Sequence, residues 1–263
     1  TAGIAAYKTA SLVRLFIKSG AEVQVIMTPA SKDFITPLTL STLSKKPVHS
    51  SFYSKEEENE LWNNHVELGL WADFMLIAPA TANTLSKMSG GTCDNLLIAT
   101  YLSAKCPVYF APAMDLDMYK HPSTITSLDK LQSFGNKMIP ATSGELASGL
   151  VGEGRMAEPQ DILAFIENDI LSTLPLRGKK ILITAGPTYE AIDPVRFIGN
   201  HSSGKMGFEI AKAAANLGAE VFLIAGPSEE QVNNTLIQRI NVVTAEEMYE
   251  ACHRCFSEVS IAI

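Results

Sequence analysis

The sequence has 263 residues, and at about 100 to 200 residues per domain this length predicts one large domain or two ordinary ones. Hydrophobic residues make up 46% and charged residues 19%, which excludes disorder as the main state. The net charge of −7 excludes a broad phosphate-neutralising surface, so we expect no nucleic-acid partner and only a local phosphate site.

Helical and short apolar segments alternate along the first part of the chain. The spacing predicts helices from the start to about residue 19, over 32–44, over 83–103, up to residue 131, and over 159–174. Strands are predicted at residues 21–28, 72–78 and 107–111. Strand and helix alternation predicts a parallel sheet covered on both faces.

After residues 175–178 the pattern restarts. Strands are predicted at residues 180–185 and 219–225, and helices at 205–217 and 245–256. We therefore expect an α/β protein of two doubly wound, Rossmann-like domains, 1–174 and 175–263, with ligands beyond the carboxyl ends of the strands. Residues 1–6 resemble a strand-to-helix turn without its strand, and residues 259–263 stop as if in mid-strand, so we expect truncation at both ends.

The sequence predicts a soluble, cytoplasmic protein with no membrane partner. No apolar run approaches the roughly 20 residues that span a bilayer, and no signal-type segment begins the chain. Four cysteines are too few for a disulfide-stapled chain of this size, which indicates a reducing compartment. Cys252 and Cys255 form a lone C-x-x-C in a segment of helical spacing. We interpret them as residues on one helix face, in preference to a zinc or redox site.

Two loops of small and hydroxyl-bearing residues open predicted helices of the first domain. One is Thr1-Ala2-Gly3, and the other is Pro79-Ala80-Thr81-Ala82-Asn83-Thr84, which follows a predicted strand. Helix-start amides and hydroxyls bind anions, so two such loops favour a phosphorylated cofactor. Neither loop is the G-x-G-x-x-G of dinucleotide enzymes, and that motif does not occur in the chain.

Five motifs in order resemble the FMN-dependent cysteine decarboxylase family. They are Ala2-Gly3-Ile4-Ala5-Ala6-Tyr7-Lys8, His65-Val66-Glu67-Leu68, Ala78-Pro79-Ala80-Thr81-Ala82-Asn83-Thr84, Cys93-Asp94-Asn95 and Pro112-Ala113-Met114. The resemblance covers nearly the whole chain and extends to the bifunctional phosphopantothenoylcysteine decarboxylase and phosphopantothenate–cysteine ligase members of coenzyme A synthesis. It implies a flavodoxin-like first sheet, FMN, and 4′-phosphopantothenoylcysteine as substrate.

The resemblance implies that FMN takes a hydride from the carbon beside the substrate thiol, so that carbon dioxide leaves. The hydride then returns to the enethiol, giving 4′-phosphopantetheine. His65 matches the active-site histidine, and an imidazole suits proton movement at a thiol; the alternative is that His65 packs beside Trp62 and Trp71. The implied FMN-binding residues are Gly3, Ile4, Thr28, Pro79, Thr81, Ala82, Asn83, Thr84 and Met114.

Two positions depart from the family pattern. The family's Asn in Pro-Ala-Met-Asn-x-x-Met, which holds the substrate carboxylate, is Asp115 here, and its Cys in Leu-Ala-Cys-Gly is Ser148. An ionised Asp115 repels a carboxylate, so it contributes only when protonated, or else the carboxylate is held by other groups. A serine is a much weaker acid than a thiol, so we expect protonation during enethiol reduction to use another donor or water. Residues 152–159 match the family's substrate-covering flap.

The second domain carries a glycine-rich loop. Residues 199–205 spell G-x-x-x-x-G-K, but Met206 replaces the magnesium-binding Ser or Thr and no apolar strand leads into Gly199, which excludes a true P-loop. The loop instead offers amides and hydroxyls to a triphosphate at a helix start. The residues expected to bind nucleotide or substrate are Arg196, Asn200, Ser202, Ser203, Gly204 and Lys205.

The run Asn-x-Ser-Ser-Gly-Lys-Met-Gly at residues 200–207 resembles the family's ligase domain. This resemblance implies CTP, Mg²⁺, 4′-phosphopantothenate and cysteine, joined through an acyl-cytidylate. Asn200 then contacts the cytidylate and Arg196 the phosphates or carboxylate; the alternatives are a turn residue and a surface ion pair. The lysine-rich closing loop is missing, so we expect no ligation by this chain alone.

Two other functions remain open within the same fold. Family members also act as regulatory subunits that bind FMN without turnover, and Asp115 and Ser148 keep that alternative. A flavin prenyltransferase is disfavoured by His65 and the second domain. The resemblance further implies a homo-oligomer, with flavin sites between subunits of trimers or dodecamers and with dimers of ligase domains.

Overall fold

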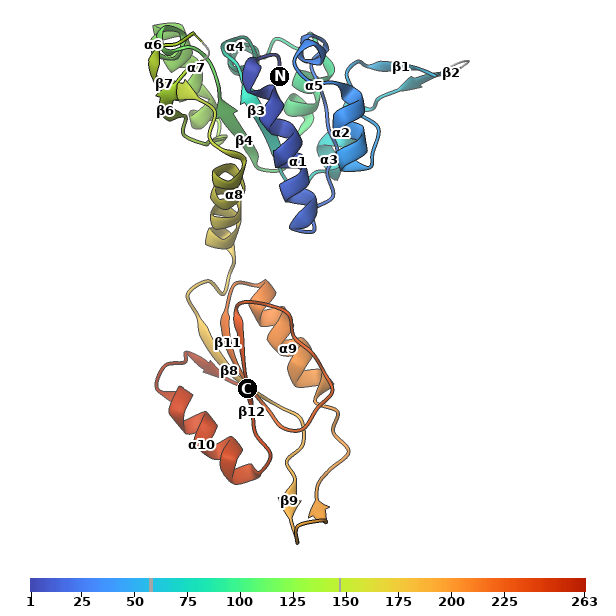
Figure 1. The fold of residues 1–263 in the computed structure, drawn as a ribbon, viewed down its shortest axis with the longest axis vertical. Helices are drawn as coiled ribbons and strands as arrows, with labels where there is room; N and C mark the ends of the chain where they lie inside the picture. The colour runs from blue at the N-terminus through green and yellow to red at the C-terminus, as the bar shows by residue number, and fades with distance from the viewer. Residues whose placement is uncertain (57–58, 147) are drawn as a thin grey trace. The chain divides into compact units, whose positions relative to one another are not determined.

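The structure is a computed structural model that describes residues 1–56, 59–146 and 148–263, without the side chains of residues 54–61. The chain divides into two compact units, Thr1–Ile166 and Glu167–Ile263, each with its own sheet (Figure 1). We describe each unit by itself.

The first unit alternates helices and strands, with hairpins inserted. Its elements are η1 (Ile4–Tyr7), α1 (Lys8–Lys18), η2 (Pro29–Asp33), α2 (Pro37–Ser44), β1 (Tyr53–Glu56), β2 (Asn59–Trp62), α3 (His65–Trp71), β3 (Met75–Ala80), α4 (Ala82–Gly90), α5 (Leu96–Ser103), β4 (Val108–Pro112), α6 (Leu116–Lys120), α7 (Pro122–Ser133), β5 (Lys137–Met138), β6 (Thr142–Glu145), β7 (Val151–Arg155) and α8 (Pro159–Thr173). Strands β3, β4 and β5 form a parallel sheet.

The buried strand β4 shows why helices cover both faces of this sheet. Successive side chains of a strand point to opposite faces. Phe110 packs in one core with residues of α4, α5 and α7, whereas Tyr109 and Ala111 pack in another with α1 and α8. Two apolar faces need two helical layers, which confirms the predicted parallel α/β class.

Local capping splits two of the predicted helices. Gly91 at φ 72° ends α4, and the Asn95 side chain accepts a hydrogen bond from the Ile98 amide to begin α5, so residues 83–103 are not one helix. In the same way, Thr36 caps α2 by accepting from the Thr39 amide. The predicted helix over 32–44 therefore starts at Pro37, after a separate 3-10 turn.

The predicted strand at residues 21–28 is wrong. In the described chain this segment forms one isolated parallel bridge, between Ile26 and His49, and no ladder. The Met27 amide donates to His49 O and the His49 amide donates to Val25 O. A strand needs a continuous neighbour to pair with, and in the described structure β3 pairs only with β4, not with this segment.

The second unit contains a four-stranded parallel sheet in the order β12-β11-β8-β13. Its elements are β8 (Lys180–Ala185), β9 (Glu190–Ala191), β10 (Phe197–Ile198), α9 (Lys205–Asn216), β11 (Glu220–Ala225), β12 (Ile237–Asn241), α10 (Ala245–Phe256) and β13 (Ile261–Ala262). Ile181 and Ile183 of β8 pack with α9, whereas Leu182 packs with α10. The sheet is again covered on both faces.

The C-x-x-C lies on helix α10, at the predicted helical segment. Both cysteines lie on this helix; Cys255 is buried, and burial raises the pKa of the Cys252 thiol. A search of the described residues finds no cluster of potential metal ligands. Among these residues, moreover, no helix has the length and apolar character to cross a membrane.

Candidate functional site

The two predicted phosphate loops of the first unit lie against each other. Thr1 Oγ1 donates to Pro79 O at 2.7 Å and lies 3.4 Å from Thr81 Oγ1, which in turn lies 3.4 Å from Thr84 Oγ1. We call Thr1, Thr81 and Thr84 the threonine cluster. A Cβ on Gly3 would lie 3.2 Å from Thr81 Cγ2, so glycine permits this close approach. The cluster lies at the carboxyl end of β3, where a doubly wound sheet binds ligands.

Two helix starts beside the cluster keep their amides open. Gly3 precedes η1 and Thr81 precedes α4, and neither helix has a side-chain capping hydrogen bond. The first amides of a helix have no intrahelical partner, and the helix dipole favours negative charge there. The arrangement therefore suits a phosphate group, held by amides and threonine hydroxyls.

Thr28 carries a polar atom that the fold leaves unused. Its Oγ1 is buried and has no hydrogen-bond partner in the described structure, while its carbonyl accepts from the amide and hydroxyl of Ser31. An unpaired buried hydroxyl costs about 1–3 kcal/mol, so such groups normally serve a ligand or a bound water. Thr28 was predicted from the family resemblance to bind the cofactor, and this hydroxyl fits that role.

Asp115 and Ser148 meet, although they are far apart in the sequence. Ser148 Oγ donates to Asp115 Oδ1 at 3.0 Å, and the Leu116 amide donates to the same oxygen at 2.7 Å. Asp115 begins α6, just after β4, and the Ala113 amide donates to Ala80 O. The two residues that depart from the family pattern are therefore hydrogen-bonded to each other, beside the end of β3.

The predicted flap is the second strand of a hairpin. Strand β7 pairs antiparallel with β6, and its glycines lie against the chain that carries Asp115. A Cβ on Gly154, at φ 136°, would lie 2.4 Å from Met114 O, and one on Gly152 would lie 2.6 Å from Leu116 Cδ1. Met114 also donates its amide to Gly154 O. At position 154 only glycine allows this approach to the backbone, which brings the residue-148 turn to Asp115.

Lys8 is a positioning residue that sequence reasoning did not single out. It is 5% exposed, and its Nζ donates to Met156 O and Glu158 Oε1, both at 2.9 Å. Arg155 also pairs with Glu158, and these contacts hold the pKa of the Glu158 carboxyl below its usual range, the Lys8 hydrogen bond being the main cause. Lys8 thus fixes the end of the β6–β7 hairpin to α1. A lysine inside the otherwise apolar Ala2-Gly3-Ile4-Ala5-Ala6-Tyr7-Lys8 motif was the available signal.

His65 lies among aromatic side chains. It begins α3, which Asn64 caps, and its ring lies 6.0 Å from that of Phe52 and 6.2 Å from that of Trp62. Its Nδ1 is buried with no hydrogen-bond partner in the described part of the molecule. Within the described residues, no hydrogen bond or ring contact joins His65 to Asp115 or to the threonine cluster. His65 thus packs beside Trp62, and its buried Nδ1 has no partner among the described residues.

Of the other predicted FMN-binding residues, Pro79 and Thr84 are buried, Ala82 and Met114 are half-buried, and Ile4 and Asn83 are exposed. Met114 packs against the core of α4, α5 and α7. These residues therefore offer both backbone groups and apolar side chains at the ends of the strands.

In the second unit the glycine-rich loop lies at the carboxyl ends of β8 and β11. A Cβ added to Gly204, which has φ 80°, would lie 3.1 Å from the backbone of Gly186, which follows β8. Ser228, which follows β11, donates its Oγ hydrogen to Ser203 O at 2.6 Å. The loop satisfies itself: the Ser202 amide donates to Asn200 Oδ1, the Gly204 amide to Ser202 Oγ, and the Lys205 amide to Ser203 Oγ. Lys205 is exposed at the start of α9.

Arg196 lies in the β9–β10 hairpin and pairs with Asp193 at 2.6 Å. The same contact, led by the Arg196 hydrogen bond, holds the pKa of the Asp193 carboxyl below its usual range. This is the surface ion pair considered as its alternative role. In the described structure, Arg196 forms no hydrogen bond or ion pair with residues 199–205.

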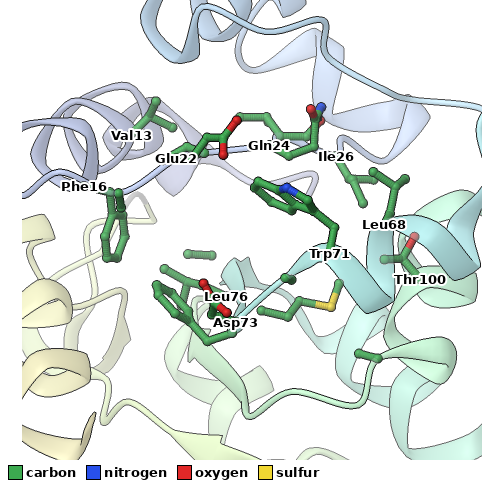
Figure 2. Close-up of a pocket in the computed structure, with 18 of the residues that line it drawn as sticks. Val13, Phe16, Glu22, Gln24, Ile26, Leu68, Trp71, Asp73, Leu76 and Thr100 are labelled. Carbon is green, nitrogen blue, oxygen red and sulfur yellow. The ribbon is translucent and has the colours of Figure 1, made fainter. Parts of the chain in front are cut away.

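A cavity of about 530 Å³ lies elsewhere in the first unit (Figure 2). It separates residues 20–26 from β3 and is lined by α1, α3 and α5, and Figure 2 shows Phe16 and Trp71 at its walls. None of the predicted cofactor residues lines it. Its walls are mainly apolar and it offers no cluster of hydroxyls, so we assign the site to the threonine cluster instead.

The first unit is a domain of the parallel α/β class, and its uncapped, hydroxyl-lined helix starts suit a phosphate group. The chain belongs to the flavoprotein family, whose sequence model matches residues 1–171. Residues 176–263 match the family described as DNA/pantothenate metabolism flavoprotein C-terminal domain.

Curated relatives confirm the resemblance found in the motifs. The chain is 53% identical over 233 residues to "Cysteine/Cysteine sulfinic acid decarboxylase" of an unknown prokaryotic organism, covering 87% of this chain and 64% of the relative. It is 46% identical to "Coenzyme A biosynthesis bifunctional protein CoaBC" of Haemophilus influenzae, covering 95% of this chain and 62% of that protein. The chain thus spans less than two thirds of these relatives' length.

Solved structures agree for the first unit. A PPC decarboxylase mutant complexed with pantothenoylaminoethenethiol aligns with a TM-score of 0.55 at 35% identity, over 64% of this chain and 92% of that one. The FMN binding protein AtHal3 aligns with a TM-score of 0.55 at 34% identity, over 65% of this chain and 93% of that one. Both likenesses support the predicted flavodoxin-like fold.

Proposed function

We propose that residues 1–174 form an FMN-binding domain that decarboxylates a cysteine carboxylate. The contact between Thr1 and Thr81 carries this proposal, because it joins the two predicted phosphate loops into one site. The relatives named CoaBC and the PPC decarboxylase neighbour support 4′-phosphopantothenoylcysteine as the substrate and 4′-phosphopantetheine as the product. The free cysteines of the described chain suit a reducing compartment, so we place the activity in the cytoplasm.

The residues of this chain divide the work. The threonine cluster, Thr28 and the amides following Gly3 and Thr81 hold the FMN phosphate, and Ile4 and Met114 offer apolar surface to the ring. When bound, FMN would supply a reversible hydride acceptor for the carbon beside the substrate thiol. His65 moves the proton at the thiol, through a ring whose Nδ1 the described residues leave unpaired.

The exposed apolar side chains beside His65 support a site completed between subunits. Trp62, Val66 and Leu70 beside it are 47%, 45% and 58% exposed, an apolar surface that a partner subunit would bury. We therefore propose a homo-oligomer, a trimer or dodecamer through the flavin domain and a dimer through the ligase domain.

For residues 175–263 we propose the N-terminal part of a ligase domain that uses CTP, Mg²⁺, 4′-phosphopantothenate and cysteine. The match to the pantothenate-metabolism domain supports this part, and the helix start at Gly204 suits a triphosphate. Arg196, Asn200, Ser202, Ser203 and Lys205 remain the proposed contacts. We expect no CTP-dependent ligation by this chain alone, and measurable product would contradict that.

The cofactor is tested by titrating the FMN-free protein with FMN and following the flavin absorbance. Thr28→Val removes the unpaired hydroxyl and is expected to weaken FMN binding about tenfold, the value of one good hydrogen bond. Thr126→Val is the matched control, because its hydroxyl bonds within α7 to Pro122 O. A protein that binds no FMN under any condition would remove the proposed function and leave the binding-module alternative without its ligand.

A second candidate substrate is free cysteine or cysteine sulfinic acid. The name of the 53% identical relative contains both compounds. Asp115 favours this candidate, because the acylated substrate would bring only a negatively charged carboxylate to the Asp115 carboxylate, and the two would repel each other.

A further inference from the structure

The carboxylate of Asp115 is held firmly but only on one side. Its Oδ1 accepts two hydrogen bonds, from the Leu116 amide at 2.7 Å and from Ser148 Oγ at 3.0 Å. Within the described residues, no Lys or Arg pairs with Asp115 and no hydrogen bond reaches its Oδ2. A fixed carboxylate without a cation is ready to receive one from a ligand.

This carboxylate lies at the same edge of the sheet as the threonine cluster. Asp115 follows β4 by three residues, and Ala80 and Pro112 are paired where β3 and β4 end. The Ala113 amide donates to Ala80 O, and Thr81 follows directly. Asp115 is therefore close to the loop that holds the cofactor in the proposed function.

The charge of the substrate decides what Asp115 does. An N-acylated cysteine presents a carboxylate and an uncharged amide, so Asp115 faces only like charge. A free amino acid carries an ammonium on the same carbon as the carboxylate. Pairing that ammonium with Asp115 offsets the repulsion and positions the carboxylate that is to leave.

We infer that Asp115 binds the α-ammonium of a free, cysteine-class amino acid, and that this site selects unacylated over acylated substrates. The inference rests on the proposed function, since it assigns the substrate class of the same FMN-dependent site. Ser148 is a positioning residue: its hydroxyl holds Oδ1, which leaves Oδ2 to the ammonium.

The reaction balances for free cysteine. The thiol loses its proton and Cβ loses a hydride to the oxidised flavin, which leaves a thioaldehyde. The Cα–carboxylate bond then breaks and carbon dioxide leaves. The electron pair of the broken bond moves into the thioaldehyde, which becomes an enethiolate. Return of the hydride and uptake of protons give cysteamine. The net change is cysteine plus one proton to cysteamine plus carbon dioxide, with no net oxidation.

Binding tests the inference independently of turnover. L-serine and N-acetyl-L-serine lack the thiol, so they bind without reacting, and isothermal titration into the FMN-loaded chain at neutral pH measures each. We expect L-serine to bind at least about tenfold more tightly than its N-acetyl form, since a charge-assisted pair is gained. Asp115→Asn should abolish this preference, and Asp117→Asn, two residues along α6 and exposed, should keep it.

Turnover separates this inference from the function on which it rests. Release of carbon dioxide is measured with cysteine and with 4′-phosphopantothenoylcysteine. We expect the kcat/KM ratio to favour cysteine and to shift at least about tenfold toward the acylated substrate in Asp115→Asn. Turnover of the acylated substrate alone, with equal binding of the two serine ligands, overturns the inference and leaves the proposed function standing. No turnover of either, with a serine preference lost in Asp115→Asn, overturns the decarboxylase and supports the ammonium site.

Discussion

Both units place a loop of small and hydroxyl-bearing residues at the carboxyl ends of a parallel sheet, yet the loops use their polar groups differently. In the first unit Thr81 caps nothing and Thr28 Oγ1 has no partner among the described residues. In the second unit Asn200, Ser202 and Ser203 accept hydrogen bonds from their own loop amides. The first loop is preorganised for an anion, whereas the second must exchange internal hydrogen bonds to bind one.

The largest expected effect is at a glycine beside the loop of the second unit. A Cβ on Gly226, which follows β11, would lie 1.7 Å from the O of Pro187, which follows β8. Gly226→Ala therefore forces these two strand-end segments apart. We expect a loss of about 3 kcal/mol or more from the unfolding free energy of the second unit. Urea denaturation monitored for each unit measures this. Gly90→Ala is the control, because the nearest atom to its Cβ is 3.8 Å away, and an equal effect of both variants would contradict the close-contact argument.

The first unit depends instead on a long-range polar anchor. Lys8→Met keeps the volume but leaves Met156 O and Glu158 without their buried donor. We expect a loss of about 1–3 kcal/mol in the free energy of unfolding, together with weaker substrate binding as the β6–β7 hairpin loosens. Denaturant titration provides the number.

Lys212→Met in the second unit is the matched control for that experiment. Its ammonium pairs with Glu209 across one helical turn on the surface, where solvent screens the two charges, so we expect almost no change in the free energy of unfolding. Similar losses for Lys8→Met and Lys212→Met would show that Lys8 is no more than another surface pair.

Elements with strong periodicity and clear caps followed from the sequence. Strand β8 and helix α10 have the predicted bounds, since an apolar run and a Thr244–Glu247 capping box specify them locally. The position of the 79–84 loop at the carboxyl end of a parallel strand also followed from the rule for such sheets. Residues 21–28 did not, because strand formation depends on a partner segment that local pattern does not reveal.

The details of the site that escaped prediction are long-range contacts. The bond between Ser148 and Asp115 depends on two glycines of β7 that accept close packing from residues 114–116. The hairpins and α3 were also not predicted, since they are short and lack a clear period. Lys8 reads as a surface residue until the fold buries it.

The smallest expected effect distinguishes the two units by their response to pH. The pKa of Glu158 is held down chiefly by Lys8 and that of Asp193 chiefly by Arg196, so each contributes stability above its unfolded pKa and loses it as pH falls through the folded value. Glu158 joins distant parts of the first unit, whereas Asp193 stabilises a local turn. In urea titrations from pH 7 to about 3, Glu158→Gln should therefore be destabilising at neutral pH and converge with the wild type on acidification, while Asp193→Asn leaves global unfolding nearly unchanged. A pH-independent difference for Glu158→Gln would show that its carboxylate charge contributes nothing to the anchor.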